Sequence, residues 1–226
     1  MKMDQARIEK AVQLATKMHE GQKRKSGDPY IVHPLAVMKI LQDWKMDEDT
    51  VIAGVLHDTV EDTGLTLEEI KREFGETVAF LVDGVTKLGK AREGMRDIDT
   101  YLPQTKDNLL RLLIATGSDI RVLIIKLADR LHNLRTLSAL PLEKQKKIAK
   151  ESLEVFAPLA DRLNMGRLRV EMSDIAFSYV DPKRYEELKN LIDEKNRSAE
   201  KTLMKIKKEV SDLLKAEKIE FEISGR

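Results

Sequence analysis

The sequence predicts an all-α protein that ends in a long amphipathic helix and one short strand. Its 226 residues include only 11 glycines, six prolines and 4% aromatic residues. Such a scarcity of turn and strand formers favours helices over a many-stranded sheet. Apolar residues recur three and four positions apart along most of the chain, as on the buried face of a helix. At this length we expect either one large domain or one domain with an appendage.

The composition excludes several classes of protein. The chain has no cysteine, which excludes disulfides, thiolate catalysis and sulfur-bound metal centres, so any metal must bind to histidine and carboxylate groups. No apolar run approaches the roughly 20 residues of a membrane span, and the charged N-terminus lacks the apolar core of a signal peptide, so we expect a cytoplasmic protein without membrane contact. A formal net charge of +1 argues against direct nucleic-acid binding, which usually needs a broad basic face.

Capping residues and apolar spacing place the helices of the N-terminal half. Pro34 favours the start of the second helix, because proline suits the first helical position, and His33 would stand just before that start. Residues 47–50 can cap the third helix, and Thr66 with Glu69 has the pattern of a capping box. We expect these helices over residues 3–19, from residue 34, and over residues 50–62, 67–74 and 75–90.

The C-terminal half contains a helix, residues 119–136, that is nearly all apolar in its first half and should be central. The polar residues 89–105 are the main candidate for a mobile loop. After Asp181 a narrow apolar stripe in a highly charged background predicts the long amphipathic helix, and alternation in residues 218–224 predicts the strand. The other helices are expected over residues 106–117, 143–163 and 166–179.

The adjacent pair His57 and Asp58 could carry chemistry on an otherwise apolar helix. Glu61 and Asp62 follow them at intervals of four residues, which would keep all four groups on one side of the helix end. Adjacent helical residues project about 100° apart, so both members of the pair can reach one ion only if it lies beside the helix. A buried pair with solvated acids at the helix end is the alternative, because the motif is short.

Asp129 is the second candidate, on the central helix. The expected core stripe of this helix is Ile120, Ile124, Leu127, Leu131 and Leu134. Asp129 points about 180° away from that stripe and shares its face with Asn133 and Thr136. A buried carboxylate needs a cation or a full set of donors, because an unpaired buried charge is costly. A salt bridge to Arg130, Arg135 or another arginine is the alternative to a metal ion.

Two histidines and two aspartates would make a hard ligand set for one divalent ion. Their total charge of −2 would neutralise the ion and leave roughly two octahedral positions for water and substrate. Manganese or iron suits such a set better than zinc. Spacing alone does not establish that His33, the pair at His57 and Asp58, and Asp129 converge.

Other residues allow both a functional and a structural interpretation. His19 and His132 could orient a neighbour by hydrogen bonding or could simply be packed histidines. Lys23, Arg24 and Lys25 form a compact basic cluster in a flexible loop. That cluster is either a solvated surface or a ligand for phosphate.

Four segments of the sequence closely resemble the hydrolase domain of long RelA/SpoT-type bifunctional alarmone enzymes. In chain order they are HEGQKRKSGDPYIVHP, LHDTVEDT, FGETVAFLVDGVTKL and DIRVLIIKLADRLHNLRTL. The match runs from about His19 to Tyr185, and the combined motifs are highly specific. The resemblance implies an all-helical HD-domain bundle. It also implies manganese-dependent removal of the 3′-pyrophosphate from (p)ppGpp, which gives GDP or GTP in stringent-response control.

The resemblance also implies residue roles. The metal ligands fall on His33, His57, Asp58 and Asp129. The acids that position and activate the attacking water fall on Glu61 and Asp62. The nucleotide-binding residues fall on Arg24, Lys25, Ser26, Tyr30, Asn133 and Thr136. Thr59 and the segment QTKDNLLRLLIATGS depart from the family pattern. We expect these departures to bear on substrate preference or loop behaviour more than on the metal site.

The tail, ISGR, resembles the start of the synthetase domain of these enzymes. We therefore expect an N-terminal fragment with a hydrolase domain at residues 1–182. Residues 183–226 would form a helical linker and the start of a truncated synthetase domain, the adjoining partner in the full-length protein. The expected ligands are (p)ppGpp and guanine nucleotides. The alternatives are a non-catalytic guanine-nucleotide-binding regulatory module and an HD phosphohydrolase that acts on another nucleotide.

Overall fold

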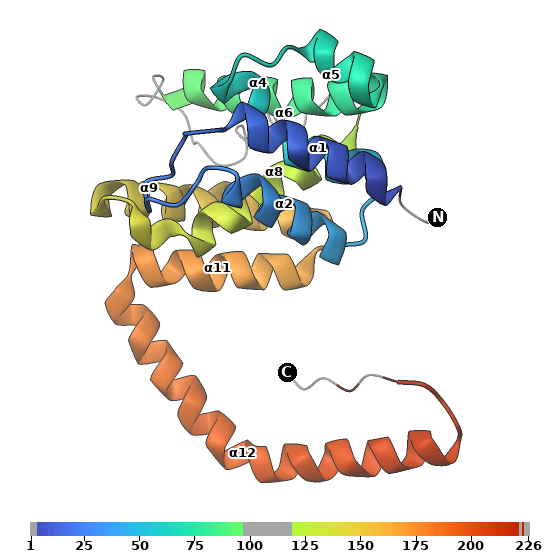
Figure 1. The fold of residues 1–226 in the computed structure, drawn as a ribbon. Helices are drawn as coiled ribbons and strands as arrows, with labels where there is room; N and C mark the ends of the chain where they lie inside the picture. Colours follow the sequence, from blue (N-terminus) through green and yellow to red (C-terminus); the bar gives the residue numbers. More distant parts are fainter. Residues whose placement is uncertain (1–3, 97–118, 222, 224–226) are drawn as a thin grey trace. The chain divides into compact units, whose positions relative to one another are not determined.

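The computed structural model describes residues 4–96, 119–221 and 223 of the chain. All regular secondary structure in these ranges is helical, which confirms the predicted all-α class (Figure 1). The chain divides into two compact units, Met1–Val180 and Asp181–Arg226. The assignment of a hydrolase domain and a linker to these two parts stays a prediction.

Two helices of the N-terminal half begin at the capping residues that the sequence indicates. The side chain of Asp47 accepts a hydrogen bond from the backbone N–H of Thr50. Thr66 and Glu69 form the predicted capping box. The helices are α1 (Gln5–Met18), α2 (Val32–Asp43), α3 (Glu48–Leu56), α4 (Thr59–Asp62), α5 (Leu67–Phe74) and α6 (Glu76–Arg96).

The helix predicted over residues 50–62 is interrupted at His57 and Asp58, which lie between α3 and α4. Side chains there donate hydrogen bonds to carbonyl groups at the end of α3. For example, the hydroxyl of Thr59 donates to the carbonyl of Leu56 at 2.6 Å. Because side-chain donors compete with the backbone N–H groups that would continue the helix, the chain turns at this point.

Two further boundaries differ from the prediction. α2 begins one residue before His33, which therefore lies inside the first turn, because Ile31 already has helical backbone angles. α6 continues to Arg96, so residues 89–96 are helical rather than part of a loop. Most residues of that segment are good helix formers, and they outweigh its glycines. The rest of the predicted loop and the helix expected over residues 106–117 lie outside the described residues.

A π-helical turn divides the helix predicted over residues 143–163. It covers Ser152–Phe156, and the N–H of Ala157 donates to the carbonyl of Ser152, five residues earlier. Pro158 follows and has no N–H, so the regular hydrogen-bond pattern is lost there. The helices of this half are α8 (Ile120–Arg135), α9 (Leu142–Glu151), α10 (Ala157–Arg162) and α11 (Gly166–Val180), with a 3-10 turn at Leu137–Ala139.

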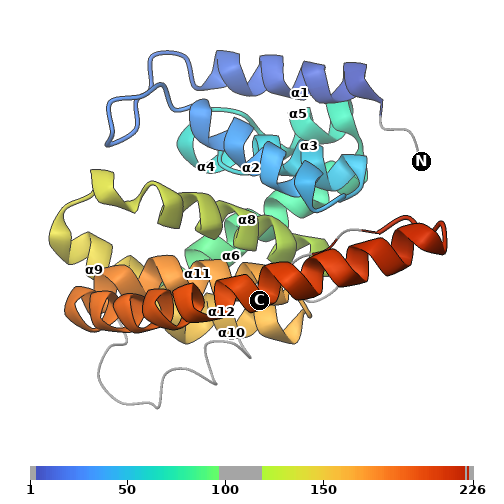
Figure 2. The same cartoon turned by 90° about the horizontal axis from the view of Figure 1, so that it is seen from below.

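Helix α8 is central to the first unit, as predicted, and packs against α2, α3, α6 and α11 (Figure 2). It is buried on both sides, with Val122 and Leu127 almost fully covered. Ile120, expected in the core stripe, is 49% exposed because it begins the helix. A Cβ added at Gly84 of α6 would lie 2.7 Å from Cγ2 of Val122. The glycine therefore allows α6 and α8 to approach closely.

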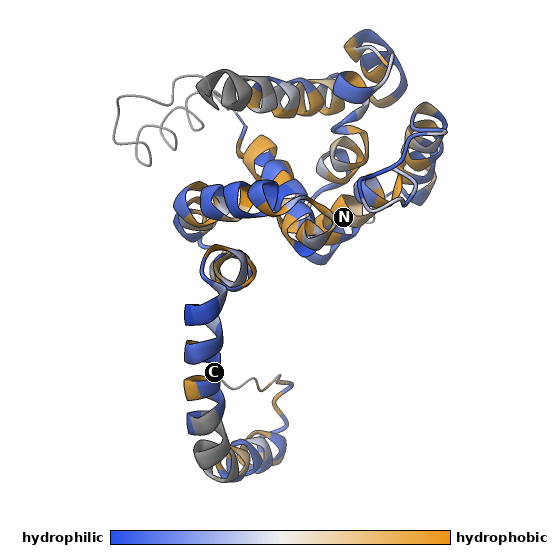
Figure 3. Cartoon of the chain, turned by 90° about the vertical axis from the view of Figure 1, so that its left-hand side faces the viewer, coloured by the Kyte–Doolittle hydropathy of each residue, from blue (hydrophilic) through white to orange (hydrophobic). Residues whose placement is uncertain are grey.

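The second unit consists mainly of α12 (Pro182–Ala216), which Asp181 caps by accepting a hydrogen bond from the N–H of Arg184. Where Figure 3 colours its ribbon, α12 is mainly hydrophilic. Residues 219–221 and 223 form no strand, so the predicted strand is absent from this described part. An isolated strand has no neighbour for its backbone groups. No helix in the described ranges is both long and apolar enough to cross a membrane.

Candidate metal centre

The turn between α3 and α4 buries the side chain of His57. Its Nδ1 donates to the carbonyl of Gly54 at 2.8 Å, so Nδ1 carries a proton, because a carbonyl only accepts. Nε2 faces the carboxylate of Asp58, whose Oδ1 lies 3.0 Å away. This nitrogen is buried and has no hydrogen-bond partner. A buried ring nitrogen that faces only a carboxylate suits a metal ion, which can bind both groups once the nitrogen is unprotonated.

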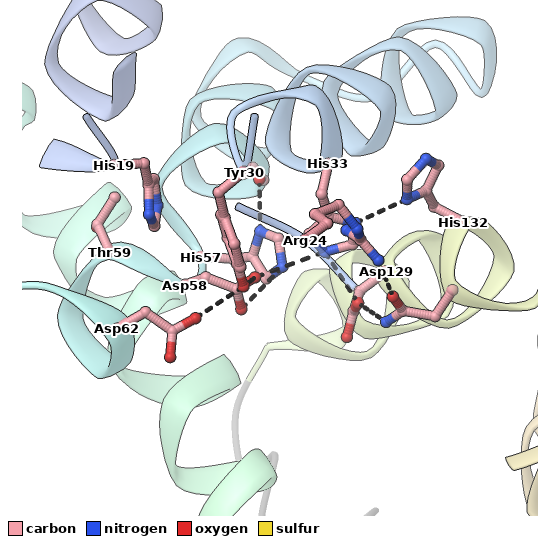
Figure 4. A network of polar contacts seen from close by, with 12 residues as sticks. His19, Arg24, Tyr30, His33, His57, Asp58, Thr59, Asp62, Asp129 and His132 are labelled. Atoms are coloured by element: carbon pink, nitrogen blue, oxygen red, sulfur yellow. Dashed lines mark hydrogen bonds and ion pairs between the residues drawn. The ribbon is translucent and has the colours of Figure 1, made fainter. Parts of the chain in front are cut away.

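His33 approaches the same point from the first turn of α2. Its Nε2 lies 3.5 Å from Oδ2 of Asp58 and 3.3 Å from Oδ1 of Asp129 on α8. Figure 4 shows these side chains and His57 pointing toward one another from three parts of the fold. The structure thus brings together the four residues whose convergence spacing could not establish.

These residues fit a divalent cation. The ligand atoms of His33, His57 and Asp58 all lie within 4.8 Å of one another, and Asp129 adds a second carboxylate beside His33. With both imidazoles neutral, the two carboxylates balance the charge of one divalent ion. Nitrogen and oxygen donors without sulfur suit a first-row metal that keeps open positions for other ligands.

The pKa values of these groups reflect burial and mutual charge. Burial alone would lower the pKa of His57, but the carboxylate of Asp58 raises it to about 9. Burial lowers the pKa of His33. Burial opposes ionisation of the two carboxyls, yet His57 lowers the pKa of Asp58, and Lys126 lowers that of Asp129. Both carboxylates are therefore charged at neutral pH, and a cation bound at His57 displaces a proton.

Lys126 is a cation of the site that the sequence analysis missed. Its Nζ lies 2.7 Å from Oδ2 of Asp129. Arg130 and Arg135, the cations suggested from sequence, pair with glutamates at 2.9 and 2.6 Å. Lys126 stands three residues before Asp129 in an otherwise apolar segment. Because residues three apart are neighbours on a helix, that lone lysine could have been recognised as the partner.

Tyr30 connects a ligand residue with a predicted acid. Its hydroxyl lies 2.8 Å from Oδ2 of Asp58 and 2.7 Å from Oδ2 of Asp62, and it has one proton for the two carboxylates. Burial and these two charges raise the pKa of the phenol, which therefore stays neutral. His19 stacks on the Tyr30 ring with the centroids 4.5 Å apart. Asp62 is thus held beside the ligand set although it is exposed.

Glu61, the other predicted acid, lies on the side of the site that α6 covers. A Cβ added at Gly89 of α6 would stand 3.2 Å from Oε1 of Glu61. The side chain of Glu61 is exposed, like that of Asp62. Both acids can therefore exchange protons with solvent.

Three of the predicted nucleotide-binding residues join the polar network around the ligands. Besides Tyr30, they are Arg24 and Asn133, whose side chains meet in a hydrogen bond of 3.0 Å from Nη2 to Oδ1. Asn133 also donates to Oδ1 of Asp129. The basic loop is therefore connected directly to α8.

In the part of the chain that the structure describes, the hydrogen bonds and ion pairs of this network do not include Lys25, Ser26 or Thr136. Lys25 is exposed, Ser26 bonds within its own loop, and the hydroxyl of Thr136 donates to a carbonyl of its own helix. The backbone of this loop forms a closed turn, and its flexibility stays a prediction. An antiparallel bridge closes residues 23–29, and Gly27 adopts the positive φ of 93° that the turn requires.

His132 contacts a ligand residue from within α8. Its Nδ1 lies 2.7 Å from Nδ1 of His33, and the ring centroids are 4.9 Å apart. Burial and the neighbouring His33 lower the pKa of His132 to about 4, so its ring is neutral at neutral pH. His132 is therefore both buried and in contact with His33, and its functional interpretation stays a prediction.

A family model described as "HD domain" matches residues 11–166. This range contains all four predicted ligands, His33, His57, Asp58 and Asp129. The chain belongs to the HD-domain family. Membership confirms the helical HD-domain fold that the sequence motifs implied, and the candidate metal centre lies within the matched part of the chain.

Curated relatives of this HD domain are much longer proteins. The chain is 47% identical over 97% of its length to a GTP pyrophosphokinase of Streptomyces coelicolor, of which it covers 25%. It is 46% identical over 88% of its length to a guanosine-3′,5′-bis(diphosphate) 3′-pyrophosphohydrolase of Aquifex aeolicus, of which it covers 27%. The chain therefore spans about a quarter of the length of these relatives.

A solved structure also resembles this HD domain. It is described as a metazoan ortholog of SpoT that hydrolyzes ppGpp and plays a role in starvation responses. The match has a TM-score of 0.56 and 28% sequence identity, and it covers 77% of this chain and 96% of that one. Together with the curated relatives, it confirms the resemblance to RelA/SpoT-type hydrolase domains.

Proposed function

We propose that this chain hydrolyses the 3′-pyrophosphate of (p)ppGpp and releases pyrophosphate with GDP or GTP. The observation that carries the proposal is the cluster of His33, His57 and Asp58, whose ligand atoms lie within 4.8 Å of one another, with Asp129 beside His33 at 3.3 Å. Two ionised carboxylates buried close to each other are costly unless cationic groups balance their charge. The substrate follows from relatives at 41–46% identity that carry the name of a 3′-pyrophosphohydrolase.

Manganese is the ion that we propose for this centre. His33 and His57 would offer Nε2, and Asp58 and Asp129 would offer carboxylate oxygens. A divalent ion bound there supplies Lewis-acid activation of water and of a phosphoryl group. The mixture of two nitrogen and two carboxylate donors suits manganese better than zinc.

The reaction adds one water molecule across a phosphoester bond. The water oxygen forms a bond to the phosphorus attached at the ribose 3′ oxygen, the bond between that phosphorus and the 3′ oxygen breaks, and the 3′ oxygen takes up a proton. We assign the proton transfers to Glu61 and Asp62, which follow the pair His57 and Asp58 along the chain and are exposed to solvent. The hydroxyl of Tyr30 holds the carboxylate of Asp62 toward Asp58.

The basic loop and the end of α8 would hold the nucleotide. Arg24 is already positioned beside Asn133, and its guanidinium can bind phosphate oxygens through two parallel N–H donors. Guanine can stack on the cation of Lys25 or the ring of Tyr30. The residues proposed for nucleotide binding are Arg24, Lys25, Ser26, Tyr30, Asn133 and Thr136.

A pyrophosphate-release assay tests the proposal. The purified chain should release pyrophosphate from ppGpp and pppGpp with Mn²⁺ present and stop when a chelator is added. GDP is the matched control, because it has no 3′-pyrophosphate. The Asp58→Asn variant should neither bind manganese nor release pyrophosphate from ppGpp. A chain that binds Mn²⁺ and ppGpp but releases no pyrophosphate would instead be a nucleotide-binding module. Release from other nucleotides only would indicate a different HD phosphohydrolase.

The names of the relatives make synthesis the second reaction to measure. Several are named GTP pyrophosphokinase, and they are about four times longer than this chain. The motifs of a synthetase beyond the tail ISGR are absent from the 226 residues. We therefore expect no ppGpp from ATP and GDP, and we propose that the adjoining synthetase domain supplies that reaction in the longer protein.

A further inference from the structure

The contact between His33 and His132 is unusual because it joins two ring nitrogens. Nδ1 of one ring lies 2.7 Å from Nδ1 of the other, and the side chains are only 2% and 8% exposed. A hydrogen bond of that length contains one proton, carried by one nitrogen and accepted by the lone pair of the other. The two rings therefore share a proton that must be on either His33 or His132.

The position of this proton decides whether His33 can bind a cation. A neutral imidazole has one protonated and one unprotonated nitrogen. Nε2 of His33 faces the carboxylates of Asp58 and Asp129 at 3.5 and 3.3 Å, so it is the nitrogen on the metal side. It offers a lone pair only when the shared proton is on Nδ1 of His33, which in turn requires an unprotonated Nδ1 on His132.

His57, the other histidine of the centre, provides a comparison within the same site. Its Nδ1 donates to the backbone carbonyl of Gly54. That acceptor cannot lose its lone pair and cannot be removed by substitution of a side chain. His33 instead depends on a side chain from α8, which lies 99 positions further along the chain. Of the two metal-side histidines, only His33 has its tautomer determined by a replaceable group.

We propose that His132 is a positioning residue that accepts the Nδ1 proton of His33 and so presents Nε2 of His33 to the metal ion. The proposal rests on the metal centre of the proposed function. Because α8 also contributes Asp129, one helix supplies a direct ligand and the acceptor that orients a second ligand. Partners of this kind typically contribute about 10- to 100-fold in metal affinity.

Substitutions at His132 separate the acceptor from the packing. In His132→Asn the side-chain oxygen takes the place of Nδ1, whereas in His132→Gln the polar group lies too far out and in His132→Leu it is absent. We expect the dissociation constant for Mn²⁺, measured by calorimetry, to rise about 10- to 100-fold in the Leu and Gln variants. The dissociation constant of the Asn variant should stay within a few-fold of that of wild type.

Leu134→Ala, a buried change on the same helix, is the control for packing. It should lower the melting temperature without changing the dissociation constant for Mn²⁺.

Nuclear magnetic resonance gives a readout that packing alone does not change. With diamagnetic Zn²⁺ bound, the wild type and the Asn variant should show a slowly exchanging proton on Nδ1 of His33, and the Leu and Gln variants should lose it. The proposal is overturned if the Leu or Gln variant, folded by its melting curve, binds Mn²⁺ as wild type does. It is equally overturned if Nδ1 of His33 carries no proton in the metal-bound wild type. Failure of the wild type to bind metal would instead contradict the proposed function.

Discussion

Asp129 carries a negative charge in the interior, and Lys126 balances that charge at 2.7 Å. We predict two opposite effects for Lys126→Met. The metal-free protein should lose about 3 kcal/mol of unfolding free energy, because a nearly buried carboxylate is left without its cation. The affinity for Mn²⁺ should increase about tenfold, because the ammonium no longer repels the incoming ion.

Denaturant unfolding and calorimetry measure these two effects. Lys126→Arg is the matched control, since it keeps the charge and should change the affinity much less. A Met variant that binds Mn²⁺ more weakly than wild type would show that Lys126 supports the ion rather than competing with it.

The acids and the basic loop should affect different kinetic constants. Glu61→Gln and Asp62→Asn should lower kcat about 10²- to 10⁴-fold with little loss of bound metal, because a positioned proton-transfer group contributes that much. Lys25→Ala should chiefly raise KM, since an exposed loop cation can hold the nucleotide without reaching the reacting phosphorus. Steady-state kinetics with metal content determined for each variant tests the division. Acid variants that lose the metal, or that turn over normally, would contradict it.

At the scale of residues, sequence patterns indicate candidate site residues within one helix but do not indicate contacts that depend on how two helices pack. The pair His57 and Asp58 and the lone Asp129 are visible as polar positions in apolar segments. The contact of His33 with His132 is not, because it depends on how α2 packs against α8. The family resemblance supplied the ligand set that spacing could not.

At the scale of elements, the close approach of α6 to α4 limits the space around the side chain of Glu61, one of the two proposed acids. A Cβ at Gly89 would stand 3.2 Å from Oε1 of Glu61, so Gly89→Ala should displace that carboxylate by a few tenths of an ångström. We predict that kcat falls about tenfold, less than the roughly 10²-fold that a 1 Å misplacement can cost. The melting temperature should not fall, because alanine stabilises a helix by up to about 1 kcal/mol relative to glycine.

Kinetics, Mn²⁺ affinity and melting curves of Gly89→Ala test this combination. Gly166→Ala is the control, since an added Cβ there meets nothing within 4 Å and the residue is far along the chain from the acids. Normal turnover in the Gly89 variant would show that Glu61 tolerates the displacement or takes no part in the reaction.

Element boundaries were less predictable than the elements themselves. Apolar periodicity indicated a single helix over residues 50–62, but the side chains of His57 and Thr59 bond to carbonyls at the end of α3 and interrupt it. The same polar residues that suggested a site therefore changed the local backbone. In the same way, Pro158 marks the π-helical turn within a segment that periodicity had assigned to one helix.

At the scale of the whole molecule, the central place of α8 was predictable from its apolar first half, because a helix that is hydrophobic on both sides must be covered on both. The terminal strand was not, since pairing depends on a neighbour that alternation within one segment does not reveal. The division into units follows from burial, because the fully buried apolar residues of the described chain end at Ala176.

This distribution of the core predicts that the first unit is sufficient for the proposed chemistry. All proposed site residues lie between Arg24 and Thr136, within Met1–Val180. A chain shortened to residues 1–180 should fold with a cooperative melting transition, bind Mn²⁺ with unchanged affinity and release pyrophosphate from ppGpp within about twofold of the full chain. The fully buried apolar residues of the described chain all lie in the first unit, so the shortened chain should keep their hydrophobic stabilisation of about 25 cal/mol per Å² of buried apolar surface. Circular dichroism, calorimetry and the pyrophosphate assay on both chains provide the comparison. If the shortened chain folds and binds metal but no longer hydrolyses ppGpp, then residues 181–226 contribute to catalysis, and the site extends beyond the HD domain.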